Sequence, residues 1–188
     1  TYSGIKSYPP LRIQYGKLRT QNLQIEVQCD VSSQFLTALL MAAPLISKKD
    51  EIIINAVGKV ISKPYIDITL HLMEKFGVKV NRIGYTSFIL PQHKKYQSPG
   101  TFYVEGDFSS ASYFLAAGAI NGGPLRLEGI GRNSIQGDIY FIDALQKMGA
   151  TVKMTENWIE VSSTRSLKPI DADFNHMPDA AMAIAIVA

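Results

Sequence analysis

The sequence predicts an α/β protein assembled from repeated small units, each with the order strand, helix, strand, helix, strand, strand. An aspartate followed within three residues by a pair of serines and an apolar helix occurs at Asp30–Leu36 and again at Asp107–Tyr113, and a third version starts at Asp173. Short alternating apolar segments, typical of strands, separate segments with helical spacing. The period of 77 residues between Ser32 and Ser109 is too long for a solenoid repeat and suits a duplicated small domain.

The first copy runs from about Leu23 to Leu90. Its strands are predicted from alternating apolar residues, and its two helices from apolar side chains that share one face. The predicted strands are Leu23–Val27, Glu51–Ile54, Val78–Val80 and Ser87–Leu90, and the helices are marked by Phe35–Ala43 and Ile66–Phe76.

The second copy runs from about Thr101 to Val161, and the polar linker Pro91–Gly100 separates the two copies. Residues 1–14 look like the end of an earlier copy, with Leu11–Gln14 as its last strand. We therefore expect residues 1–100 to be the later part of one domain and 101–188 the first part of another. The second copy's predicted strands are Thr101–Val104, Leu125–Glu128, Thr151–Met154 and Trp158–Val161, and its helices are marked by Tyr113–Ala117 and Ile142–Met148.

The composition and charge limit the classes of function that this protein can have. Hydrophobic residues make up 46% of the 188 residues and charged residues 19%, which is ordinary for a protein with a sizeable core. The net charge of +3 is mild. Basic residues pair only at Lys48–Lys49 and Lys94–Lys95, which we interpret as solvated loop charges rather than an anion-binding patch. Nothing in this pattern supports nucleic-acid binding.

The single cysteine, Cys29, has no internal disulfide partner, which fits a reducing, cytoplasmic compartment. We interpret it as a buried bystander rather than a reactive thiol. No apolar run is long enough to span a membrane, and no segment resembles a signal peptide. Because the sequence starts without methionine and stops inside the apolar segment Ala180–Ala188, we expect a piece of a longer protein.

Paired serines stand where the first helix of each copy begins. Ser32 and Ser33 are followed by Gln34, so two hydroxyls, an amide and free helix N–H groups can cradle a phosphate or carboxylate. Helix capping alone explains the same serines equally simply. In the second copy Ser109 and Ser110 are followed by alanine, and we expect that pair to be a structural cap.

The second helix of the first copy opens with Ser62, a good cap, and with Pro64, which suits a first helical turn. Tyr65 can present its hydroxyl to a ligand or pack on its own turn. In the third start, Asp179 replaces the serines, and its carboxylate is either dipole compensation or a general base beside the anion site. The three histidines have no spaced partners, so we expect no metal site and no cofactor.

Five segments together resemble the bacterial form of the 5-enolpyruvylshikimate-3-phosphate synthase family. They occur in the family's order and span nearly all of the chain. The resemblance implies two domains, each built from three of the predicted units in the family's inside-out barrel. The segments are Val31–Met41, Ser62–Thr69, Tyr96–Gly100, Gly129–Ser134 and Met177–Ala181.

The resemblance implies carboxyvinyl transfer from phosphoenolpyruvate to the 5-hydroxyl of shikimate 3-phosphate, with release of phosphate, in aromatic amino-acid biosynthesis. It assigns Ser32 and Ser33 to the shikimate phosphate and places Gln34 between the two substrates. Ser62 and Tyr65 would contact the same phosphorylated substrate. Asp179 would bind shikimate hydroxyls and abstract the proton from the reacting one. In the intact enzyme, which we expect to be monomeric, these groups would face each other across a cleft that closes on substrate.

The resemblance also shows what this sequence lacks. The family's lysine-serine and asparagine-glycine-threonine loops and its later lysine-glutamate and aspartate-histidine-arginine motifs have no counterpart here. Those segments supply most of the phosphoenolpyruvate site and of the glyphosate contacts, so we expect the isolated chain to be inactive. Two other hypotheses stay open: the related transferase acting on UDP-N-acetylglucosamine, and an anion-binding scaffold without catalysis.

Overall fold

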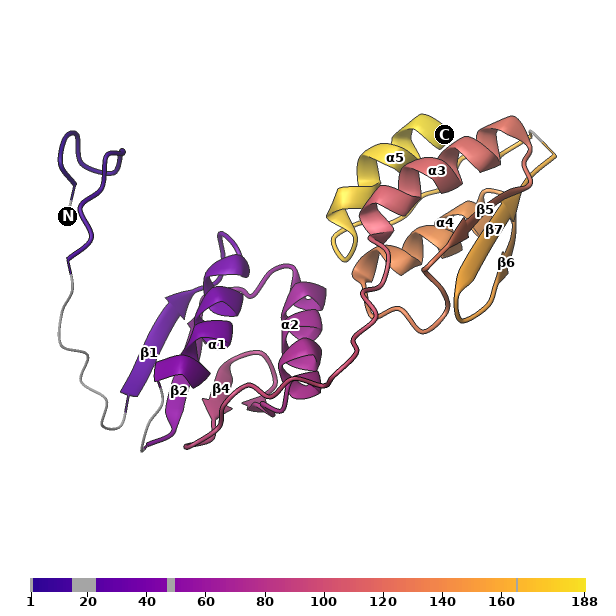
Figure 1. Ribbon diagram of the computed structural model, residues 1–188. Helices are drawn as coiled ribbons and strands as arrows, with labels where there is room; N and C mark the ends of the chain where they lie inside the picture. The colour runs from indigo at the N-terminus through magenta and orange to yellow at the C-terminus, as the bar shows by residue number, and fades with distance from the viewer. Residues whose placement is uncertain (1, 15–22, 47–49, 165) are drawn as a thin grey trace.

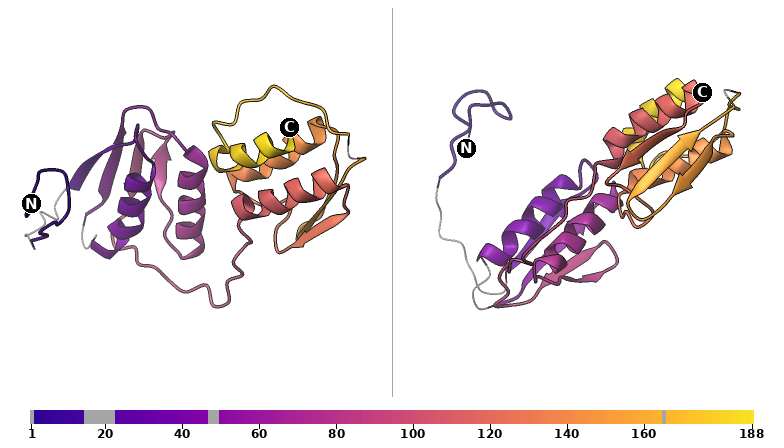
Figure 2. Two further views of the ribbon diagram at one scale, coloured as in Figure 1. Left: turned by 90° about the horizontal axis from the view of Figure 1, so that it is seen from above. Right: turned by 45° about the vertical axis from the view of Figure 1, so that its right-hand side comes forward.

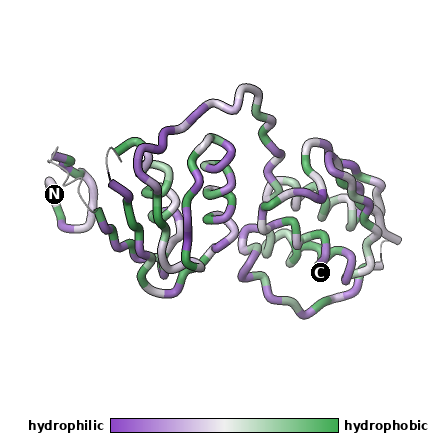
Figure 3. The backbone as a smooth tube through the Cα atoms, turned by 90° about the horizontal axis from the view of Figure 1, so that it is seen from below, coloured by the Kyte–Doolittle hydropathy of each residue, from purple (hydrophilic) through white to green (hydrophobic). Residues whose placement is uncertain are grey.

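The computed structural model describes residues 2–14, 23–46, 50–164 and 166–188. Two halves, each a sheet packed against helices, lie side by side and are joined by an extended segment (Figures 1 and 2). Each half has its own cluster of buried apolar residues. Hydrophobic stretches are concentrated in the helices and strands of both halves (Figure 3). The pair Lys48–Lys49 lies outside the described residues.

The first half contains the complete predicted unit. Strands β1 and β2 are parallel neighbours, and β4 pairs with β2 and β3 in antiparallel fashion, so the sheet order is β1-β2-β4-β3. The helices follow β1 and β2, as a parallel pair requires. The elements are β1 (Leu23–Gln28), α1 (Gln34–Ile46), β2 (Ile52–Val57), α2 (Lys63–Lys75), β3 (Asn81–Ile83) and β4 (Ser87–Leu90).

The predicted apolar patterns make the core of this half. Ile52 and Ile54 of β2 are buried, as the alternation requires, and Phe88 of β4 is fully buried opposite Ile54. From the helices, Leu36 and Ile66 enter the same cluster. The two helices therefore cover one face of the sheet, and their first turns are anchored to it.

The second half has a smaller, antiparallel sheet in the order β5-β7-β6. Helices α3 and α4 pack on this sheet, and α5 packs on those two helices. The elements are α3 (Phe108–Asn121), β5 (Leu125–Glu128), the 3₁₀ turn η1 (Gly137–Tyr140), α4 (Phe141–Lys147), β6 (Thr151–Met154), β7 (Trp158–Ser162), the 3₁₀ turn η2 (Pro178–Ala180) and α5 (Ala181–Val187).

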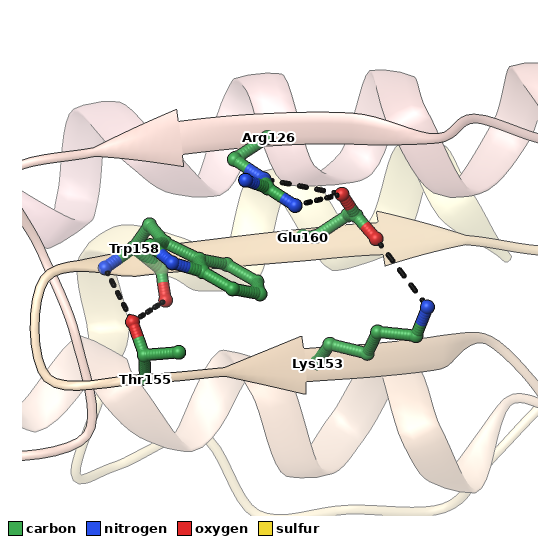
Figure 4. A network of polar contacts seen from close by, with 5 residues as sticks. All are labelled: Arg126, Lys153, Thr155, Trp158 and Glu160. Atoms are coloured by element: carbon green, nitrogen blue, oxygen red, sulfur yellow. Dashed lines mark hydrogen bonds and ion pairs between the residues drawn. The ribbon is translucent and has the colours of Figure 1, made fainter.

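The other face of this sheet is polar (Figure 4). The Arg126 guanidinium lies 3.9 Å from the centre of the Trp158 ring and donates to Glu160 at 2.9 and 3.1 Å. Lys153 Nζ lies 3.7 Å from the other Glu160 oxygen. A sheet with one packed and one charged face is typical of antiparallel pairing.

Three predicted strands are wrong. Thr101–Val104 has strand composition but forms no ladder, and Tyr103 is 89% exposed. After this segment Gly106 N–H donates to Gly129 O at 2.8 Å, whereas the first half has the whole β1–β2 pairing. A strand exists only through its neighbours, so composition alone did not decide this segment.

The other two errors have the same kind of cause. Val78–Val80 is no strand: Val78 is buried beneath α2 and donates its N–H to Met73 O, so β3 begins at Asn81 instead. Leu11–Gln14 is no strand either. Within the described residues, only an isolated bridge between Tyr2 and Leu11 pairs this segment.

Candidate functional site

The sheet brings two candidate helix starts to one edge. Because β1 and β2 are parallel, their carboxyl ends are neighbours, and the loops that follow lead into α1 and α2. The loops are themselves tied by Ile61 N–H donating to Cys29 O at 3.5 Å. Cys29 is fully buried, as expected, and burial raises its pKa above the ordinary value. The candidate segments 32–34 and 62–65 therefore stand at the same end of the first half.

At the start of α1, the hydroxyl of Ser32 accepts a hydrogen bond from the N–H of Gln34 at 3.1 Å. Ser33 is only 3% exposed, and its carbonyl accepts from Thr37 N–H. The Gln34 side chain is exposed. The predicted capping role is confirmed for Ser32. An α-helix has four N–H groups without an intrahelical partner at its start, and this bond satisfies one of them.

The start of α2 differs from the prediction. Ser62 adopts the left-handed conformation (φ 52°, ψ 45°), and its side chain makes no capping bond, so the predicted cap is wrong. In that conformation Ser62 instead offers its carbonyl to Tyr65 N–H at 3.2 Å. Pro64 does occupy the first turn, as predicted. The Ser62 hydroxyl is consequently not committed to its own helix.

At the start of α3, neighbouring side chains of the second half accept hydrogen bonds from the first backbone N–H groups. Asp107, not the serine pair, is the cap: its carboxylate accepts from the N–H groups of Ser109 and Ser110. These bonds, led by the one from the Ser110 hydroxyl, lower the pKa of Asp107. Gln136 accepts from Phe108 N–H at 2.8 Å. The predicted serine caps are therefore wrong in detail, although the structural role is right.

Sequence reasoning did not single out Asp138, which is 5% exposed. It accepts a short hydrogen bond from the Ser109 hydroxyl, and burial raises its pKa. The burial of Asp138 depends on its packing against the start of α3, which no local sequence pattern reports.

Two candidates from different halves are in direct contact. The Tyr65 hydroxyl donates to Asp179 Oδ2 at 2.6 Å, although 114 positions separate the residues. Burial first, and then the neighbouring carboxylate of Asp179, raises the pKa of Tyr65. The phenol therefore stays protonated over the physiological range. This bond places the α2 start against η2 across the gap between the halves.

A cavity of about 810 Å³ opens beside that contact. Its size fits a small-molecule ligand. The first half contributes Lys59, Ser62 and Lys63 to its wall, and the second half contributes Asp173 and His176, among others. Residues 32–34 and Asp179 do not line it. The structure thus joins Tyr65 to Asp179 and places Ser62 on the cavity, whereas the α1 start lies at the same sheet edge outside its wall.

Among the described residues, no group of three His, Cys, Asp or Glu side chains is arranged to hold a metal ion. Nor is any helix of the described ranges long and apolar enough to cross a membrane.

Comparisons with known proteins show which sequences and structures this chain resembles. The family profile described as EPSP synthase (3-phosphoshikimate 1-carboxyvinyltransferase) matches residues 2–188. Proteins with the name 3-phosphoshikimate 1-carboxyvinyltransferase from Herminiimonas arsenicoxydans and Cellvibrio japonicus are 59% and 54% identical over 187 and 189 residues. All of this chain is covered, but only 42% and 44% of those relatives, so the chain spans less than half of their length.

Solved structures of enolpyruvyl transferases are similar to this chain as well. EPSP synthase from Acinetobacter baumannii matches 97% of this chain and 41% of its own, with a TM-score of 0.65 and 25% identity. The enolpyruvyl transferase NikO from Streptomyces tendae matches 88% of this chain and 41% of its own, with a TM-score of 0.61. At 17% identity the second likeness concerns the fold alone. The predicted α/β enolpyruvyl transferase fold is confirmed over this part.

Proposed function

This chain belongs to the EPSP synthase (3-phosphoshikimate 1-carboxyvinyltransferase) family, and from this premise we propose the activity of a full-length protein that carries it. That protein transfers the carboxyvinyl group of phosphoenolpyruvate to the 5-hydroxyl of shikimate 3-phosphate. The hydroxyl loses its proton, its oxygen bonds to the vinyl carbon that carried phosphate, and inorganic phosphate leaves. No cofactor is needed for this exchange. We place the reaction in the cytoplasm and the intact enzyme as a monomer.

The shikimate phosphate is proposed to bind at Ser32 and Ser33. Support comes from the position of these serines at the first turn of α1, where helix N–H groups attract anions. Gln34 is exposed beside them, and we propose that it contacts phosphoenolpyruvate. Ser62, with a hydroxyl that caps no helix, faces the cavity and can join the phosphate contacts.

Asp179 is the proposed base. A carboxylate that accepts the hydroxyl proton must be exposed to substrate yet held in place. Asp179 is exposed, and one of its oxygens is fixed by Tyr65 at 2.6 Å while the other has capacity to accept from a substrate hydroxyl. We propose further that residues 1–100 and 101–188 belong to two domains, with the site between them.

The single observation that supports this proposal most is the contact between Tyr65 and Asp179. It joins residues from two separate family motifs, and their sequence neighbours Pro64 and Pro178 line one cavity. The test is a phosphate-release assay on the full-length protein with phosphoenolpyruvate and either shikimate 3-phosphate or UDP-N-acetylglucosamine. We expect release with shikimate 3-phosphate alone. Release only with the nucleotide sugar would assign the related transferase, and release with neither would leave an anion-binding scaffold.

The isolated 188-residue chain is expected to give no turnover in the same assay. The resemblance implies that the family's main phosphoenolpyruvate motifs have no counterpart in this sequence. Turnover by the isolated chain at an enzymatic rate would show that those motifs are dispensable.

A further inference from the structure

The way in which the two halves are joined allows them to change their separation. Each half has its own cluster of buried apolar residues, and an extended segment connects them (Figure 1). In that segment Tyr103 and Val104 are exposed and belong to no strand. Units with separate cores and an extended connection are expected to move relative to each other. A feature that biases their separation therefore also sets how open the cavity between them is.

The halves come into close contact beside the cavity, at Gly137. A Cβ atom on Gly137 would lie 2.6 Å from His176 O in the second half and 3.0 Å from Pro64 Cγ in the first. Glycine permits this approach because it has no Cβ atom. Pro64 and His176 also line the cavity of about 810 Å³. Rotation of the halves about this contact therefore moves the two walls of the cavity together or apart.

The two walls of the cavity carry opposite charges. Lys59 and Lys63 line it from the first half, and Asp173 lines it from the second. Lys63 Nζ lies 5.1 Å from the centre of the Tyr85 ring in its own half. Within the described ranges, neither Lys59 nor Asp173 takes part in an ion pair. Lys59 and Asp173 are thus opposite charges on opposite walls that no described ion pair neutralises.

Lys59 extends from a constrained loop. Gly58 before it has a φ of 82°, and a Cβ atom there would lie 3.0 Å from Gln28 Nε2. Two positions after Lys59, Ile61 N–H donates to Cys29 O at 3.5 Å. The Lys59 side chain itself is exposed, and a lysine ammonium is carried on a flexible four-carbon stem. The loop therefore fixes the backbone of Lys59 at the cavity, while the ammonium can extend toward the opposite wall.

Asp173 is held in its ionised form. The backbone N–H and the side-chain amide of Asn175 donate to Asp173 Oδ1 at 2.8 and 2.6 Å. These bonds, led by the one from the backbone, lower the pKa of Asp173 below its ordinary value. Both of them use Oδ1, so Oδ2 keeps its capacity to accept. The second wall therefore presents a carboxylate that is charged at neutral pH.

We infer that Lys59 and Asp173 form an electrostatic latch between the halves: as the halves approach, the ammonium and the carboxylate pair across the cavity and favour the closed arrangement. Lys63, on the same wall as Lys59, adds attraction at longer range. An exposed ion pair is weak, so the latch biases the two arrangements rather than locking one. This inference goes beyond the proposed function and does not depend on which reaction the protein catalyses.

The test measures the closed population in the full-length protein without substrate. Spin labels on unnatural amino acids replace Val57 and Met182, exposed residues close in sequence to the two cavity walls, and electron paramagnetic resonance gives the short and long distance populations. Lys59→Glu and Asp173→Lys should each lower the ratio of short to long distances about two- to fivefold. The double variant should restore the ratio, because the exchanged charges are again complementary.

Two control variants reverse exposed charges that do not line the cavity. Lys79→Glu changes a lysine of the first half that pairs with Glu74 in the same half, and Glu156→Lys changes an exposed carboxylate of the second half. Both should leave the ratio unchanged. An unchanged ratio in Lys59→Glu or in Asp173→Lys would overturn the inference. A loss in Lys59→Glu that the added Asp173→Lys does not reverse would overturn it too, because Lys59 would then act on a different group.

Discussion

The starts of α1 and α3 occupy the same position in two copies of one unit, yet their first turns are satisfied differently. At α1 the Ser32 hydroxyl accepts from a single backbone N–H, that of Gln34. At α3 three consecutive N–H groups, those of Phe108, Ser109 and Ser110, already donate to Gln136 and Asp107. The described side-chain bonds therefore satisfy one backbone N–H group at the α1 start and three at the α3 start.

This difference shows how a duplicated fold acquires one site rather than several. The backbone of the unit places a helix N-terminus at the corresponding point of both copies, and an N-terminus attracts negative charge wherever it lies. At α3 the charge comes from Asp107 of the chain itself. At α1 the nearby aspartate, Asp30, makes no described bond to the first turn, and we propose that substrate phosphate supplies the charge. Side chains, not the fold, decide between the two outcomes.

The largest expected effect is on turnover, and it concerns Asp179 in the third repeat of the helix start. Asp179→Ala in the full-length protein should lower turnover by about 100- to 10,000-fold and change substrate affinity far less, because a general base acts in the transition state. Steady-state kinetics with both substrates measure the two quantities. Asp143→Ala is the matched control, since Asp143 is also an exposed aspartate in the first turn of a helix, α4. Equal, small effects in both variants would reduce Asp179 to dipole compensation.

A smaller effect, on the free energy of unfolding, is expected from removing the Asp107 cap at the start of α3. Asp107→Ala should lower the free energy of unfolding by about 1–2 kcal/mol, whereas Asp107→Asn, which keeps a capping oxygen, should cost much less. Urea denaturation followed by the fluorescence of Trp158, the single tryptophan of this sequence, measures the change in the second half.

The same variant has a defined pH dependence. The folded-state pKa of Asp107 is lowered by its bonds to the first turn, so its contribution is present above the ordinary value of about 3.9 and is lost as pH falls through the lowered value. The wild-type advantage over Asp107→Ala should therefore shrink in strong acid. An advantage that persists there would mean that the cap does not depend on the charge of Asp107.

The smallest expected effect concerns Asp138, and here the variant should be more stable than the wild type. Burial raises the pKa of Asp138, so ionising it costs stability as pH rises from the ordinary value through the raised one. Asp138→Asn can still accept from the Ser109 hydroxyl and should raise the free energy of unfolding at neutral pH, by less than the Asp107 cap contributes. The difference should vanish below a pH of about 3.9. A destabilised variant at neutral pH would show that the carboxylate charge is needed.

Local patterns predicted most of this fold because they act over a few residues. Alternation identified β2 and β4, and helical spacing identified α1 and α2, since each pattern reports the face that is buried. Thr101–Val104 has the same alternation and is no strand, because pairing depends on a distant neighbour.

The features of the candidate site also differ in whether local sequence patterns can predict them. The Asp107 cap was accessible from sequence, since the aspartate stands two positions before Ser109 and caps follow local rules. The bond between Tyr65 and Asp179 was not, because it depends on how the two halves pack. The left-handed conformation of Ser62 was not either, because serine rarely adopts it.

The central claim is that α1 binds the substrate phosphate and that α3 binds its own aspartate. Calorimetric titration of the full-length protein with shikimate 3-phosphate tests it in two paired variants. Ser32→Ala with Ser33→Ala should weaken binding by about 10- to 100-fold, and Ser109→Ala with Ser110→Ala should leave the dissociation constant unchanged. Normal affinity in the first double variant, or equal losses in both, would contradict the account.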